Sequence, residues 1–205
     1  GARVLVVANA DAFAARYGSG LPVADRAALC VTLGLNRETG RHVPALDEFA
    51  NDQTADGFKA LLKGESSSPL ARLFVPAVCS RLYAGDLSGI DRLTSAIASI
   101  PAGRRGEVMI IQDVIYPVHA GLVSYIGRPG VKMTPAELET ILACVKTLAA
   151  LTKSEHRGML SQLVYFVATD AASLEAGLKR CGLEGVKPAM ATTLGMGVSR
   201  SFSER

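Results

Sequence analysis

The residues best suited to hold a metal are Cys144 and His156, which stand twelve residues apart in the second half of the chain. A tetrahedral zinc site needs about four Cys, His or carboxylate ligands, usually supplied as two close pairs. Neither residue has a second member of such a pair, because position 147 is Thr and position 160 is Leu. We therefore expect no metal site.

Enzymatic signatures are also missing from the sequence. No serine lies in a G-x-S-x-G elbow, His42 stands in a turn-forming segment and His119 in an apolar helical one, so a hydrolase triad has no support. The segment "TTLGMGVSR" lacks the third glycine of a dinucleotide-binding turn and follows no opening strand. We expect a protein that is not an enzyme and needs no cofactor. One alternative stays open, a small cytosolic α/β enzyme with a first strand at residues 3–10 and Asp11 as its catalytic carboxylate.

Positive charge is mild and lies in the second half of the chain. The formal net charge is +3, and residues 101–205 supply it with twelve basic and nine acidic residues. Basic residues in this half gather at turns and helix ends, as Arg104 with Arg105, Arg128 with Lys132, and Lys153 with His156 and Arg157. If these groups converge, they could hold phosphate groups of lipid or RNA through a salt-sensitive interaction. Composition alone favours the simpler interpretation, ordinary surface charge.

Helices must position these residues, and the clearest one begins at Thr134. Thr134, Pro135 and Glu137 supply an N-cap, a first-turn proline and a capping-box partner. A second helix is expected from Ser68 to a C-terminal Gly85, with Pro76 removing one hydrogen bond and bending it. A third follows Asp170 and ends with two basic residues. Shorter helical patterns cover about 23–34, 44–63, 87–99, 107–126 and 158–168.

The composition fits an all-α protein with reduced cysteines. Apolar runs surround the four cysteines, which indicates buried thiols in a cytosolic or nuclear protein; they are Cys30, Cys79, Cys144 and Cys181. No secretory signal is visible. The apolar stretch 108–127 contains Asp113 and Pro117, so we expect a buried core helix and at most peripheral membrane contact. The predicted fold is a multi-helix bundle of two packed helical subdomains, residues 1–129 and 130–205.

The order of these segments resembles the matrix proteins of orthomyxoviruses. The stretch "YIGRPGVKMTPAELETILACVKTLAALTKSEHR" is similar to the middle of that family, where a Tyr, a turn and a Cys-containing helix lead to a Ser-x-His-Arg signature. Upstream, "SSSPLARLFVPAVCSRL" looks like the family's Ser-Pro-Leu helix. The stretches "GLPVADRAALCVTLGL" and "DEFANDQTADGFKALLKG" resemble its two opening helices. The agreement covers about residues 11–160 and fits a divergent genus, such as the fish or tick-borne orthomyxoviruses, better than influenza.

The resemblance implies a structural protein that oligomerises beneath a viral envelope and bridges anionic lipid to the ribonucleoprotein. Its implied partners are other copies of the chain, anionic membrane, viral nucleoprotein or RNA, and viral glycoprotein tails. Its implied locations are the virion beneath the envelope, and the host cytoplasm, inner plasma-membrane face and nucleus. Thr147 and Met159 stand where influenza members have a second Cys and His, so the family's zinc site is not expected. The residues assigned to the lipid or nucleoprotein face are Arg104, Arg105, Arg128, Lys132, Lys153 and Arg157. An RNA-binding nucleocapsid protein is the helical alternative.

Overall fold

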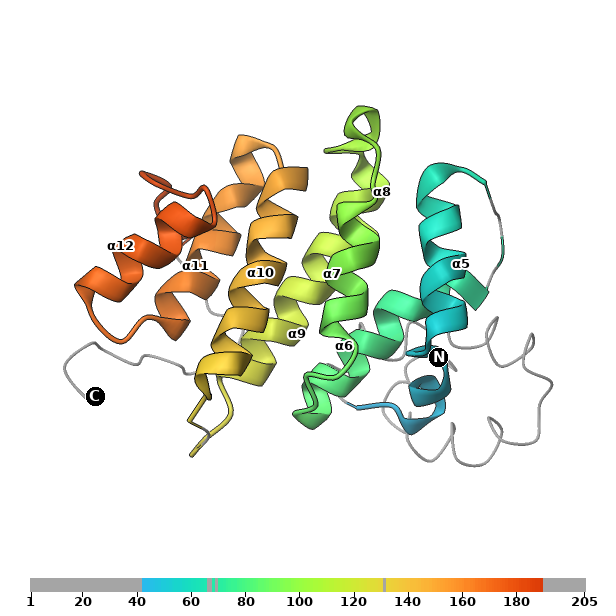
Figure 1. Ribbon diagram of the computed structural model, residues 1–205, viewed down its shortest axis with the longest axis horizontal. Coiled ribbons are helices and arrows are strands. Elements are labelled where there is room, and N and C mark those ends of the chain that lie inside the picture. Colours follow the sequence, from blue (N-terminus) through green and yellow to red (C-terminus); the bar gives the residue numbers. More distant parts are fainter. Residues whose placement is uncertain (1–41, 66–67, 69, 131, 190–205) are drawn as a thin grey trace, which may run out of the picture. The chain divides into compact units, whose positions relative to one another are not determined.

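The computed structural model describes residues 42–65, 68, 70–130 and 132–189. Every regular element in these residues is helical and none is a strand, which confirms the all-helical prediction (Figure 1). The chain divides into two compact units, with the boundary between Tyr125 and Ile126. The boundary predicted from the sequence lay between residues 129 and 130. The expected strand at 3–10, the expected helix at 23–34, Asp11 and Cys30 all lie outside the described residues.

The helical pattern predicted over residues 44–63 forms two separate elements. The 3-10 helix η2 covers Pro44–Phe49, and α5 covers Asp52–Lys63. Asn51 separates them, because its extended backbone and its side chain, which accepts a hydrogen bond from the Thr54 amide at 2.9 Å, make it the N-cap of α5. Gly64, with φ of 80°, ends α5 in the left-handed conformation.

The next helix begins later than the sequence predicted, which places Pro76 near its start. The 3-10 helix η3, Leu70–Leu73, leads directly into α6, Phe74–Ala84. Pro76 therefore lies in the first turn of α6, where the backbone N–H that proline lacks is least needed. Gly85, with φ of 87°, provides the predicted left-handed end.

Two further helical segments complete the first unit. Helix α7 covers Ile90–Ala98, and the 3-10 turn η4, Ala102–Arg104, follows it. A continuous rod then consists of α8, Val108–Ile110, the π-helical turn η5, Ile111–Ile115, and α9, Tyr116–Ile126. The wide π turn lies just before Pro117, whose ring would otherwise clash with a preceding carbonyl and whose nitrogen cannot donate.

The rod Val108–Ile126 is the one helix in the described chain that is long and apolar enough to cross a membrane by length and composition. Only 44% of the most apolar stretch of this rod is buried. The core helix of a soluble protein can be equally long and apolar. The sequence-based expectation of a core helix therefore describes one side of this rod, while the other side is open to solvent.

The core of the first unit lies between α5, α6, α7 and the rod. Helix α6 packs against η2, and α5 packs against η3 and α7. The Phe58 and Phe74 rings meet with centroids 5.7 Å apart, and Leu82, Leu93 and Val118 are completely buried. Burial of such side chains contributes about 1.5–3 kcal/mol each.

The second unit is built on the hairpin of α10, Pro135–Leu151, and α11, Arg157–Val167, joined through the 3-10 turn η6, Ser154–His156. Helix α12, Ala171–Arg180, packs on both. The predicted capping box of Thr134 and Glu137 is confirmed, with both reciprocal hydrogen bonds present. Asp170 is confirmed as the N-cap of α12, where its side chain accepts from the Ser173 amide at 2.7 Å.

Candidate functional site

Arg104 is held by neighbouring groups and is half-buried. Its guanidinium donates to both Glu107 carboxylate oxygens, with Nε–Oε1 3.1 Å and Nη2–Oε2 2.9 Å. Its Nη1 donates to the carbonyls of Leu61 and Leu62 in the last turn of α5, and the Leu61 carbonyl also accepts from the Gly64 amide at 3.0 Å. The hydrogen bond from Arg104 lowers the pKa of the Glu107 carboxyl. Arg104 therefore fixes the turn between α7 and α8 rather than presenting a free cation.

Arg105 and Val108 are the side chains that this turn presents to solvent. Arg105 is exposed and forms no ion pair in the described part of the chain. Val108 is 76% exposed, and the small residues 101–103 of the turn are exposed as well. The structure thus separates the two predicted arginines, because Arg104 points into the protein surface and Arg105 away from it.

Helix α10 separates the other four predicted residues into two pairs. Arg128 and Lys132 precede it, while Lys153 and Arg157 follow it. A helix of 17 residues is about 25 Å long, so the two pairs occupy opposite ends of the second unit. Lys132 and Lys153 are exposed and Arg128 is half-buried. The four residues do not form a single pocket.

Arg157 has a structural partner of its own. Its Nη2 donates to the carbonyl of Gly182, just beyond the end of α12, and the side chain is half-buried. The amide of Ala189 also donates to the carbonyl of Gly158 at 2.9 Å, so the segment after α12 is fastened to the start of α11. Arg157 ties α11 to the end of α12, which leaves Lys153 as the exposed cation of this pair.

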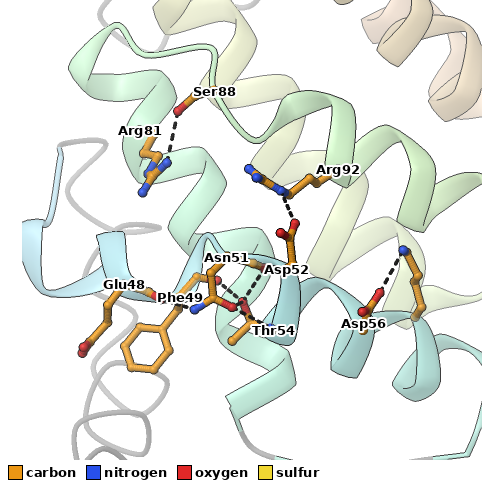
Figure 2. Close-up of polar contacts among 10 residues, drawn as sticks. Glu48, Phe49, Asn51, Asp52, Thr54, Asp56, Arg81, Ser88 and Arg92 are labelled. Atoms are coloured by element: carbon orange, nitrogen blue, oxygen red, sulfur yellow. Dashed lines mark hydrogen bonds and ion pairs between the residues drawn. The ribbon is translucent and has the colours of Figure 1, made fainter.

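One polar cluster of the first unit has a structural role. Figure 2 shows Arg92 paired with Asp52 across α7 and α5, and Arg81 bonded to Ser88. Arg81 also donates to the carbonyl of Asp47 at 3.0 Å. The Arg92 pair joins α7 to α5, and the contacts of Arg81 join α6 to η2 and to the turn before α7. The cluster contains no group of acids, bases and nucleophiles arranged for catalysis.

Cys144 and His156 have different surroundings. Cys144 is completely buried in the core of the second unit, whereas His156 is half-buried in η6. Within the described residues, no three His, Cys, Asp or Glu side chains gather closely enough to hold a metal ion. Burial raises the pKa of the neighbouring Cys181 thiol to about 11, so this cysteine stays protonated and unreactive at neutral pH.

Sequence reasoning did not identify Val108 as a surface residue. The sequence placed it in an apolar helix expected to be buried, and no local pattern marks which side of that helix is open. Searches of protein-family models, curated proteins and solved structures found no match to this chain. The function is therefore argued from the residues alone.

Proposed function

We propose that the chain is a viral matrix protein that oligomerises into a layer beneath the envelope and bridges anionic membrane to the ribonucleoprotein. The resemblance to orthomyxovirus matrix proteins in the order of segments over residues 11–160 supports this proposal. In this interpretation the protein carries out no chemical reaction, and its surface contacts are its function.

One observation carries the proposal. Lys132 and Lys153 are exposed cations without ion pairs among the described residues, and α10 holds them about 25 Å apart. A small phosphorylated ligand cannot reach both ends of this helix. An extended polyanion, such as a lipid surface or a ribonucleoprotein, can contact both at once, and weak contacts made together add through multivalency.

Arg105 supplies a separate exposed cation on the first unit. Each basic side chain close to an anionic membrane is worth about 1 kcal/mol, and salt weakens this attraction. With a net charge of only +3, we expect binding that is moderate and lost as salt rises. Arg104 and Arg157, which are held by protein groups, are expected to contribute less than these three residues.

The test is co-sedimentation of the full chain with phosphatidylcholine vesicles that contain or lack phosphatidylserine, across a salt series. Binding should require phosphatidylserine and fade with salt. The triple variant Arg105→Glu, Lys132→Glu, Lys153→Glu should weaken binding by about 100-fold or more. Because it has the same charge change on exposed residues, the triple variant Arg72→Glu, Lys146→Glu, Lys179→Glu is the matched control and should lose much less.

Three results would argue against the proposal or its assigned residues. Failure to bind phosphatidylserine vesicles at low salt would remove the membrane function. Tight binding to single-stranded RNA that persists at high salt, without vesicle binding, would favour the nucleocapsid alternative. Equal losses in the two triple variants would show that general charge, and not the assigned residues, attracts the membrane.

A further inference from the structure

The two exposed large apolar side chains in the described part of the chain lie on the same rod. They are Val108, 76% exposed, and Tyr116, 37% exposed. An α turn takes 3.6 residues and a π turn about one residue more, so one turn of each spans about eight residues. The π turn Ile111–Ile115 lies between the two side chains and therefore brings them onto one line.

Ala120, which is also exposed, extends this line by about one more turn. Val108, Tyr116 and Ala120 together form what we call the Val108 face. Asp113 is the exposed acid of the rod, and it lies off the line by about a quarter turn. The Val108 face is thus uncharged along its length and has Arg105 at its N-terminal end.

The turn before the rod is built to hold this end in place. Arg104 joins the turn to Glu107 and to the end of α5 through the hydrogen bonds described above. Because Arg104 is fixed, Arg105 and Val108 are presented from a held backbone rather than from a loose loop. Ordering them at a surface then costs little additional conformational entropy.

We propose that the Val108 face is the part of the first unit that enters the headgroup region of an anionic bilayer, with Val108 inserted and Arg105 against lipid phosphate. The inference rests on the proposed membrane function and assigns its contact surface. Apolar side chains with a neighbouring cation suit the boundary between headgroups and acyl chains, and tyrosine is favoured at that depth. The exposed cation without an ion pair favours an anionic lipid surface over a second copy of this uncharged face.

The chain has no tryptophan, so a single one can report on this surface. In Val108→Trp, vesicles containing phosphatidylserine should shift the emission to the blue, and brominated acyl chains should quench it. Gln53→Trp is the matched control. Gln53 is exposed in the first turn of α5, at the opposite end from the carbonyls that Arg104 contacts, and its emission should stay unchanged.

A second pair of variants measures the energetic role of the side chain. Val108→Ser should lower the vesicle partition coefficient by about tenfold, whereas Val108→Leu should preserve or raise it. Both substitutions are at an exposed position, so neither removes core packing.

The outcomes separate this inference from the function on which it rests. If the wild type binds phosphatidylserine vesicles but Val108→Trp is not quenched, the membrane function stands and the assignment of the Val108 face is wrong. If no variant binds vesicles, both are wrong. A blue shift that grows with protein concentration in the absence of lipid would assign the face to contacts between copies and overturn the inference.

Discussion

Arg104 and Glu107 form a two-bonded ion pair within one turn, and the same guanidinium reaches the carbonyl of Leu61 at 3.4 Å. A carbonyl 43 residues earlier in the chain is thereby joined to the turn that presents Arg105. Only the planar fork of arginine can serve all of these acceptors together, since a lysine ammonium is a compact point charge.

Arg104→Lys should therefore lower the midpoint of thermal unfolding by about 2–5 °C, because the contact with the end of α5 or with one Glu107 oxygen is lost. Circular dichroism at 222 nm measures the midpoint. The neighbouring substitution Arg105→Lys is the control and should leave it unchanged, since Arg105 is exposed without an ion pair. Equal midpoints for all three proteins would contradict a structural role for Arg104.

Ser80 attaches the start of the described chain to α6. Its buried Oγ accepts a hydrogen bond from the buried Val43 amide at 2.6 Å. Ser80→Ala would leave that amide without a partner, so we expect a loss of roughly 1–3 kcal/mol in the free energy of unfolding. Urea denaturation measures the change.

Ser161→Ala provides a matched control for this prediction. Ser161 is equally buried, but its hydroxyl donates only to the Gly158 carbonyl, which also accepts from the Ala189 amide. Its removal should cost less than about 1 kcal/mol because no backbone group loses its last partner. If the two variants lose the same stability, the special role of the Ser80 bond is excluded.

Gly177 allows α12 to pack closely against α11. A Cβ at this position would lie 2.8 Å from Cγ1 of Val164, a β-branched side chain with little freedom to move. Gly177→Ala should destabilise the protein by about 1–2 kcal/mol, because the overpacking outweighs the gain in helix propensity. Gly103→Ala, where a Cβ meets nothing within 4 Å, should be nearly neutral in the same denaturant series.

The features that the sequence predicted are those whose partners lie close along the chain. The capping box of Thr134 and Glu137 involves residues three positions apart, Asp170 directly precedes the helix that it starts, and Gly85 ends its helix through its own backbone. Spacing within one turn is enough to find them. The all-helical fold follows from the same local signals repeated along the chain.

The candidate site depended on contacts that sequence spacing does not reveal. Arg104 and Arg157 looked like available cations, but each also donates to a backbone carbonyl that lies 43 and 25 residues away, respectively. The exposure of Val108 depends on the direction of a whole rod, and the π turn before Pro117 changes which residues share a side. Only the folded arrangement of the elements decides these points.

The ion pair between Glu139 and Arg180 predicts a pH-dependent stability of the second unit. Arg180 Nη1 donates to Glu139 Oε1 at 2.6 Å, and this bond lowers the pKa of the Glu139 carboxyl. A carboxyl whose pKa is lowered by folding contributes stability at pH values above its unfolded pKa of about 4.3. That contribution is lost as the pH falls through the lower pKa of the folded state.

Glu139→Gln should therefore be less stable than the wild type at pH 7, and the difference between them should shrink when the pH falls below about 4. Urea midpoints at several pH values measure both proteins, and the effect of other carboxylates cancels in the comparison. Glu175→Gln, an exposed change on α12 at a residue without an ion pair among those described, controls for loss of surface charge. Protonation of Glu139 must remove any charge-assisted bond to Arg180. A stability difference between wild type and Glu139→Gln that stays constant down to pH 3 would therefore show that the pair adds no pH-dependent stability.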